Sequence, residues 1–348
     1  MPPRVRRTLP PALIPARCCS CAAIIPLIIR NTAHYRAPWW LPGGHLQTIY
    51  AAALARRHGV NYRRARWDTP DGDFIDVDWL DGDAQKPLLV LFHGLEGSSQ
   101  SHYALSLMSA ARKLKWRGIA VLFRGCSGEI NRLPRAYHSG DSAEINWILR
   151  RLKQQNPQSA IYAIGVSLGG NALLKWLGEQ GAAANDVIQA AAAVSAPLDL
   201  MAAGDHLGQG FNLFYTRIFL SSMKRKYKEK LRLFPLLFER DAMLRAKTLR
   251  EFDDIITAPV HGYKNTDDYW TRASSKPGLK NIQTPALIIN ARNDPFLPAR
   301  ALPPPAEVST AVTLEFPEQG GHAGFVSGTF PGHLDWLPQR IFSYFLNT

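Results

Sequence analysis

The chain has 348 residues, of which 46% are hydrophobic and 20% charged, as is typical of a globular protein with one large α/β domain or two small ones. Its net charge of +13 is uneven, because residues 1–67 hold 11 arginines and no acidic residue while the remainder is close to balance. No basic–aromatic recognition module accompanies this charge and no run of about 18 apolar residues occurs, which argues against a nucleic-acid-binding protein and against a membrane-spanning helix.

Residues 1–35 are predicted to be a basic, proline-rich and poorly ordered extension, followed by a folded domain over 36–348. The extension contains an apolar stretch, but its prolines and scarce serines do not fit a signal or transit peptide. Cys18 and Cys21 form a C-x-x-C pair without a second pair or a histidine at zinc-site spacing. Since no disulfide framework is visible, a reducing compartment, the cytoplasm, is expected.

Beyond the extension, short apolar runs alternate with longer helical stretches. This pattern predicts a mostly parallel sheet with helices on both faces. A partly exposed strand is expected at 74–80 and a buried central strand at 87–92, where the run PLLVLF is apolar throughout. Up to residue 195, further helices are expected at 101–116, 143–155 and 169–180, and further strands at 119–123, 160–166 and 188–195.

The alternation stops between about residues 201 and 278. This segment has no clear strand and is rich in Phe, Leu, Lys and Arg. Strands resume at 285–290 and 312–316, and an amphipathic helix at 333–346 closes the chain. The simplest interpretation is one sheet domain with a helical cap, at about 201–278, inserted between two of its strands.

Residues 165–169 read Gly-Val-Ser-Leu-Gly and match the pattern G-x-S-x-G. The pattern places a nucleophilic serine on a sharp turn from a strand to a helix, where the flanking positions must be small because strand and helix approach closely. A strand is expected before this segment and a helix after it. Ser167 is therefore the predicted nucleophile.

A serine hydroxyl is a weak nucleophile and needs a general base. When the strand-to-helix turn carries the serine, the acid and then the histidine follow it along the chain. His322 lies in the small-residue loop GGHAG after the last strand and is the predicted base. Of the other candidates, His206 and His261 fall in the cap and His333 begins the closing helix.

The acid that orients the base should follow the carboxyl end of a strand. Asp294 comes directly after PALIIN, and Pro295 fixes the turn behind it, so Asp294 is the predicted acid. Asp199 follows the preceding strand and is the competing candidate. Each of these carboxylates could instead cap a helix or a turn.

A tetrahedral intermediate needs two backbone N–H donors for its oxyanion. One is expected from Leu168, the residue after the nucleophile, and the other from Leu95 in the loop HGLEG that follows PLLVLF. His93 in the same loop is interpreted as a structural histidine. Neither a phosphate-binding loop nor an H-E-x-x-H motif is present, so no cofactor or metal is predicted.

With these residues the chain resembles the YheT-like (EMB8-like) branch of the α/β-hydrolases, to which the mammalian abhydrolase-domain 1, 2 and 3 proteins are related. The resemblance implies an α/β-hydrolase fold, the triad Ser167, Asp294 and His322, and hydrolysis of carboxylic esters, with short- to medium-chain esters or acylglycerols as substrates. It is carried by PGGHLQT (42–48), DGDFIDVDW (71–79), HGLEGS (93–98), FRGCSG (123–128), NRLPRAYHSGD (131–141) and GVSLGGN (165–171).

Two matters stay open at this level. The polar stretch 124–141 either braces the edge of the sheet or contacts substrate, and no role is assigned to Arg132, Arg135, Tyr137 or His138. An acyltransferase on the same fold, or a non-catalytic lipid-binding protein, remains an alternative to the hydrolase. The basic cap, with Lys224, Arg225, Lys226 and Lys228, is expected to face an anionic membrane surface or an anionic substrate group.

Overall fold

The computed structural model describes residues 34–56 and 58–348, and within these residues eight strands form one sheet in the order β1-β2-β4-β3-β5-β6-β7-β8. β2 runs antiparallel to both its neighbours, whereas the remaining pairs are parallel. The mostly parallel sheet predicted from the sequence is thereby confirmed. The strands are β1 (Arg63–Asp68), β2 (Phe74–Leu80), β3 (Leu88–Phe92), β4 (Arg117–Leu122), β5 (Ile161–Val166), β6 (Ala190–Val194), β7 (Ala286–Ile289) and β8 (Val312–Glu315).

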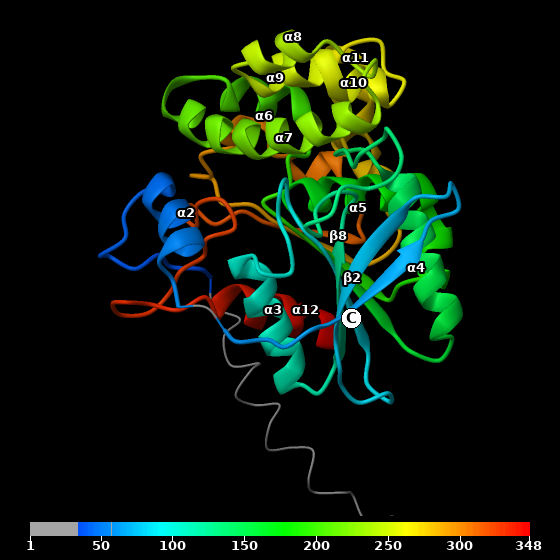
Figure 1. Ribbon diagram of the computed structural model, residues 1–348. Coiled ribbons are helices and arrows are strands. Elements are labelled where there is room, and N and C mark those ends of the chain that lie inside the picture. The colour runs from blue at the N-terminus through cyan, green and yellow to red at the C-terminus, as the bar shows by residue number, and fades with distance from the viewer. Residues whose placement is uncertain (1–33, 57) are drawn as a thin grey trace, which may run out of the picture.

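Helices cover both faces of this sheet (Figure 1). One face packs against α3 (His102–Lys113) and α12 (Trp336–Leu346), and the other against α4 (Ser142–Gln155) and α5 (Leu168–Gln180). β3 shows how one strand serves both layers, since Val90 and Phe92 belong to the core on the α4–α5 side and Leu89 and Leu91 to the core on the α3–α12 side. This double burial explains why the strand is apolar at every position.

The segment between β6 and β7 is helical and lies over one end of the sheet, at the top of Figure 1. We call residues 200–273 the helical cap. Its core packs Leu220, Met223 and Tyr227 of the long helix α7 against Phe252 and Ile256. The elements of the cap are α6 (Leu200–Leu207), η2 (Gly210–Asn212), α7 (Leu213–Leu233), α8 (Arg240–Arg245), α9 (Leu249–Phe252), the π-helical segment η3 (Asp253–Thr257), α10 (Ala258–Val260) and α11 (Thr266–Ala273).

The edge strand β1 was missed in the sequence, and the expectation that 74–80 is partly exposed is wrong. β2 is buried at every position except Trp79, because β1 covers its outer side and β4 its inner side. Its two aspartates lie directly opposite arginines of β1, and Arg64–Asp78 and Arg66–Asp76 are 2.8 Å ion pairs. The polar strand β1 therefore joins the sheet through charge pairing.

Smaller differences concern the two ends of the chain. The closing helix begins at Trp336, three residues later than expected, because His333 forms an isolated bridge with Ser327. The expected extension 1–35 falls outside the described residues except for its end, where Tyr35 is buried and its hydroxyl donates to the Val326 carbonyl at 2.6 Å. No helix in the described part of the chain is both long and apolar enough to cross a bilayer.

The connections η1 (Gly181–Asp186), η4 (Lys276–Asn281), η5 (Ala299–Ala301) and η6 (Pro305–Glu307) complete the sheet domain. One further helix, α2 (Gly44–Ala53), was not predicted. It lies to the side of the sheet in Figure 1, next to the loops that follow β7 and β8.

Candidate active site

Ser167 sits at the junction of β5 and α5 in a left-handed conformation, with φ 53° and ψ −121°. The junction leaves no room for a side chain on either side. A Cβ on Gly165 would lie 2.4 Å from the Gly169 carbonyl oxygen, and a Cβ on Gly169 would lie 2.5 Å from the Phe92 carbonyl oxygen. Non-glycine residues in this backbone region cost about 1–3 kcal/mol, and such strain clusters at functional sites.

His322 and Asp294 are in contact at the same end of the sheet. The imidazole Nδ1 is 2.9 Å from Asp294 Oδ2 and 3.1 Å from Oδ1. The carboxylate is completely buried and also accepts a hydrogen bond from the Phe296 N–H at 2.8 Å. The ring of Phe296 stacks on the imidazole with centroids 4.1 Å apart. Among the described residues, His322 Nε2 has no hydrogen-bond partner.

Helix α2 holds the loops that carry these two side chains, a function that the sequence did not reveal. Thr48 Oγ1 accepts from the His322 N–H at 2.8 Å. Gln47 Oε1 accepts from the Gly320 N–H at 2.8 Å and from the Asn293 side-chain amide at 3.1 Å. Both residues lie in the PGGHLQT segment, so its resemblance to a family motif was the available signal.

The competing acid, Asp199, has a different environment. Its carboxylate caps α6 by accepting from the Ala202 N–H at 3.0 Å. The two ring nitrogens of the competing histidine His261 lie 2.7 Å from the Thr257 carbonyl oxygen and 3.0 Å from the Ala136 carbonyl oxygen. Neither residue contacts the His322–Asp294 pair.

The two expected oxyanion donors flank Ser167. Leu168 is the first residue of α5, and Leu95 follows Gly94, whose Cα approaches so closely that a Cβ would lie 3.0 Å from Ser167 Cβ. Within residues 34–56 and 58–348, the N–H groups of Leu95 and Leu168 donate to no protein acceptor. Both are therefore available to a ligand.

The neighbouring His93 is structural. Its Nδ1 lies 2.7 Å from the Gly94 carbonyl oxygen, and its Nε2 accepts from the Phe123 N–H at 3.1 Å. Burial lowers the pKa of His93 to about 4, so the ring is neutral at physiological pH. Its hydrogen bonds fix the start of the turn that carries Leu95.

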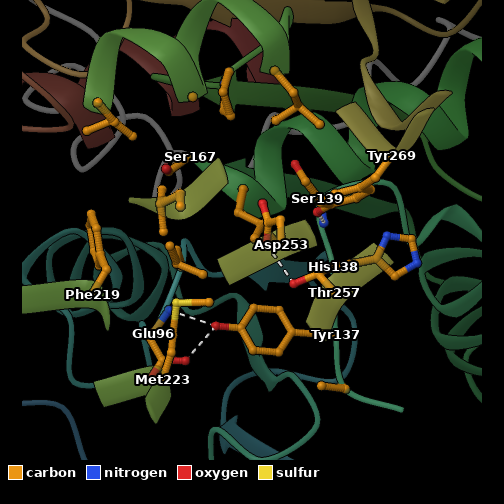
Figure 2. Close-up of a pocket in the computed structure, with 18 of the residues that line it drawn as sticks. Glu96, Tyr137, His138, Ser139, Ser167, Phe219, Met223, Asp253, Thr257 and Tyr269 are labelled. Atoms are coloured by element: carbon orange, nitrogen blue, oxygen red, sulfur yellow. Dashed lines mark hydrogen bonds between the residues drawn. The ribbon is translucent and has the colours of Figure 1, made fainter. Parts of the chain in front are cut away.

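Ser167 and His322 line two cavities, one of about 130 Å³ beneath the cap and a more open one of about 520 Å³ toward α2 and α3. Figure 2 shows Ser167 in the first cavity, together with Phe219 and Met223 of α7. The wall that the cap contributes is largely apolar and includes Leu200, Ala203, Leu207, Phe219, Met223 and Leu249. An apolar cavity next to the serine suits the hydrocarbon part of a ligand.

The cap also contributes polar groups to the lining of the same cavity. Asp253 accepts hydrogen bonds from the Thr257 hydroxyl at 2.6 Å and the Trp270 indole N–H at 2.9 Å, and burial raises its pKa to about 6. Burial lowers the pKa of Lys230 to about 8, and its ammonium donates to the Asn131 and Leu133 carbonyls.

The polar stretch 124–141 both braces the edge of the sheet and lines the cavity that contains Ser167. Arg124 is buried and pairs with Asp71, Asp73 and Glu144, which braces the edge of the sheet. Tyr137 and His138 line the cavity that contains Ser167 (Figure 2), and Arg124 also borders it.

Two further observations concern possible metal ligands and cysteines in the described residues. No group of three His, Cys, Asp or Glu side chains there could hold a metal ion. The one free cysteine in this part is Cys126, and burial raises the pKa of its thiol to about 11. The C-x-x-C pair of Cys18 and Cys21 lies outside the described residues.

Three comparisons with known proteins bear on this arrangement. Residues 87–329 match the family model described as alpha/beta hydrolase fold. The chain is 41% identical over 303 residues to the putative esterase YheT of Escherichia coli, covering 85% of this chain and 88% of that protein. It is 30% identical over 325 residues to the human phospholipase ABHD3, covering 90% of this chain and 79% of that protein.

Solved structures show the same fold. A Pyrococcus furiosus esterase, PF2001, superposes with a TM-score of 0.54 at 15% identity, covering 83% of this chain and 91% of that one. The sequence matches confirm the predicted resemblance to the YheT-like branch.

Proposed function

The chain belongs to the YheT-like branch of the α/β-hydrolase fold family, and on that premise we propose that it is a serine esterase that cleaves carboxylic esters through an acyl-enzyme. The observation that carries the proposal is that the strained Ser167 and His322, whose Nδ1 contacts the buried Asp294, line the same two cavities. Strain at a serine is retained when it presents the hydroxyl to a ligand. An imidazole held by a buried carboxylate is the base that such a hydroxyl needs.

In the proposed reaction, Ser167 Oγ attacks the ester carbonyl while His322 Nε2 takes the hydroxyl proton. Asp294 keeps the Nδ1 proton in place and stabilises the imidazolium that forms. The Leu95 and Leu168 N–H groups bind the oxyanion. His322 then gives its proton to the leaving alcohol, and a water molecule repeats the sequence on the acyl-enzyme. Apart from the ester and water, the proposed reaction uses only side chains and backbone of this chain.

The substrate class follows from the cavity and from the relatives. The apolar wall beneath the cap suits an acyl chain. The names of the relatives, a putative esterase and a phospholipase, support an ester or lipid substrate. We therefore propose short- to medium-chain esters or acylglycerols, bound with the acyl chain beneath α7.

The test is labelling with a fluorophosphonate probe, followed by hydrolysis of p-nitrophenyl esters from C2 to C16. Wild-type protein should be labelled and should turn over esters with a chain-length optimum, whereas Ser167→Ala should lose both properties. The loss should be about 10³-fold or more, as expected for removal of a catalytic nucleophile. A folded wild-type protein that the probe does not label would refute the proposal.

We propose the membrane contact expected from the basic cap on a revised set of residues, which keeps Arg225 and Lys228 and omits Lys224 and Lys226. Lys226 and Lys224 point inward, since their ammonium groups bind Glu96 and the carbonyls of Leu244 and Ala246. The exposed cations of α7 include Arg217, Arg225 and Lys228, and they share the helix with the exposed apolar side chains Phe214 and Ile218. Phe214 and Ile218 also line the larger cavity. An apolar and cationic surface at the cavity entrance suits an anionic lipid surface.

Sedimentation with phosphatidylglycerol vesicles tests this surface. Replacing Arg217, Arg225 and Lys228 by glutamine should weaken binding, because each cation near an anionic surface contributes about 1 kcal/mol. The matched control replaces three exposed lysines away from α7, Lys86, Lys113 and Lys280, by glutamine. Equal losses of vesicle binding in the two triple variants would contradict a membrane-docking role for α7.

A further inference from the structure

The turn that carries Leu95 contains a second unusual residue, Glu96. The Gly97 N–H donates to the Gly94 carbonyl at 3.0 Å, so residues 94–97 form a β-turn with Leu95 and Glu96 at its central positions. Glu96 has φ 55°, a left-handed conformation that glycine adopts freely and that costs any other residue conformational free energy. Contacts of the Glu96 side chain must offset this cost.

The Glu96 carboxylate is bound on both oxygens, and its side chain is only 9% exposed. Oε1 accepts from the Tyr137 hydroxyl at 2.9 Å and from the Lys226 ammonium at 2.8 Å, and Oε2 accepts from the Ser222 hydroxyl at 2.5 Å. The backbone N–H of Glu96 also donates to the Tyr137 oxygen at 2.8 Å. The two contacts between Glu96 and Tyr137 are drawn in Figure 2.

These partners come from two parts of the fold. Ser222 and Lys226 are four residues apart on α7 and therefore lie on the same face of the cap helix. Tyr137 belongs to the loop after β4 and stacks on Phe123, with ring centroids 5.3 Å apart and planes 3° apart. Glu96 thus connects the cap to the sheet domain at the residue that follows Leu95.

We propose that Glu96 is a positioning residue for ester hydrolysis: its carboxylate holds the Leu95 N–H in the oxyanion site while α7 is seated on the turn. The inference rests on the proposed function, because it assigns Leu95 to the oxyanion. Seating of the cap and stabilisation of the oxyanion are then coupled through one side chain. Displacement of α7 removes two of the donors that hold the turn.

The variants follow from the chemistry of the carboxylate. In Glu96→Gln one oxygen becomes an NH₂ group, which can donate to the Ser222 hydroxyl, but the negative charge that pairs with the Lys226 ammonium is lost. Glu96→Ala removes every side-chain contact. The double variant Ser222→Ala/Lys226→Met leaves Glu96 in place and removes only its partners on α7. Lys224→Met is the matched control, because the Lys224 ammonium binds carbonyls within the cap.

The measurements are kcat and KM for p-nitrophenyl butyrate, the Ki of an alkyl trifluoromethyl ketone, and the melting temperature. Addition of Ser167 Oγ to the ketone carbonyl, with the proton passing to His322, places a negative oxygen where the oxyanion forms, so Ki reports the donors directly. We expect Glu96→Ala to lower kcat about 10- to 100-fold and to raise Ki by the same factor, since loss of an oxyanion donor costs about 10²–10³. KM should stay within about 2-fold, and Glu96→Gln and the double variant should fall between Glu96→Ala and wild type.

Two outcomes would overturn the inference. One is a kcat within about 3-fold of wild type in both Glu96→Ala and the double variant, a difference too small for an oxyanion donor. The other is a joint change of kcat, KM and melting temperature like that of Lys224→Met, which would show a structural role alone. If Glu96→Ala does not fold, the double variant decides the question. A wild-type protein without esterase activity would instead refute the proposed function, and the probe assay detects that case separately.

Discussion

Two groups of buried ionisable side chains lie at the same end of the sheet, and they differ in whether every nitrogen of the basic side chain has a hydrogen-bond partner. Arg124 is 3% exposed, and its three guanidinium nitrogens all bond carboxylates, those of Asp71, Asp73 and Glu144. The His322–Asp294 pair has one ring nitrogen, Nε2, without a partner in the described chain, and it borders two cavities. Burial and charge are common to both groups. An unsatisfied atom that faces a cavity marks the candidate site.

The largest effect is expected from Asp294→Asn, which disturbs the group with the free nitrogen. The amide cannot hold the imidazole tautomer in which Nδ1 carries the proton, so kcat should fall about 10³- to 10⁴-fold while the protein stays folded. Steady-state hydrolysis of p-nitrophenyl butyrate measures the loss. Asp199→Asn is the control, because asparagine also caps a helix and should leave kcat unchanged. A larger loss of kcat in Asp199→Asn than in Asp294→Asn would indicate that Asp199 is the acid.

Next in size is Arg124→Met, which disturbs the group whose guanidinium nitrogens all bond carboxylates. Removing the guanidinium leaves three carboxylates near one another without their cation, so the free energy of unfolding should fall by about 3–5 kcal/mol. Urea unfolding measures this, and kcat per folded molecule should remain near the wild-type value. Arg63→Met removes an exposed arginine paired with Asp81 at 3.4 Å and should cost less than about 1 kcal/mol. A large drop in kcat of Arg124→Met without a loss of stability would contradict a purely structural role for the Arg124 group.

The smallest effect concerns Asp253, a buried carboxylate of the cap without a paired cation in the described residues. Its pKa rises from 3.8 to about 6 through burial, so between these values the folded protein keeps a proton that the unfolded chain releases. The free energy of unfolding should therefore decrease as pH rises from about 4 to 6, by about 2–3 kcal/mol, and then level off.

Asp253→Asn should remove this part of the pH dependence, which urea unfolding at a series of pH values can show. The exposed neighbour Asp254 provides the control, because Asp254→Asn should leave the slope between pH 4 and 6 as in wild type. If Asp253→Asn leaves the pH dependence of the free energy of unfolding unchanged, Asp253 is not desolvated in the folded protein. Water in the cavity would then solvate its carboxylate.

The sequence was sufficient where local pattern and local chemistry agree. The strands β3, β5 and β7 and the turn around Ser167 could be predicted because a buried parallel strand is apolar throughout and the turn requires glycine at 165 and 169. The helical nature of the segment after β6 could also be anticipated from the missing strand pattern.

The sequence was insufficient where a segment depends on distant partners. β1 reads RRARWD and carries no apolar alternation, because its place in the sheet depends on aspartates of β2. α2 is short, and Gln47 and Thr48 have their structural role only through hydrogen bonds to Gly320 and His322, which lie in a loop near the other end of the sequence. The contacts of Glu96 with α7 were likewise invisible, since nothing in the segment HGLEGS indicates a cap helix more than a hundred residues later.

The contacts of Gln47 also constrain the order in which the protein can be made. Asn293 and Gly320, which share the Gln47 amide oxygen, follow it by 246 and 273 residues. At about 5–20 residues per second of synthesis, α2 leaves the ribosome on the order of tens of seconds before these partners exist. Loop closures over such separations are slow entropic steps. A nascent chain therefore carries the strained turn at Ser167 long before the loops of Asp294 and His322 are fixed, and the proposed ester cleavage requires a nearly complete polypeptide.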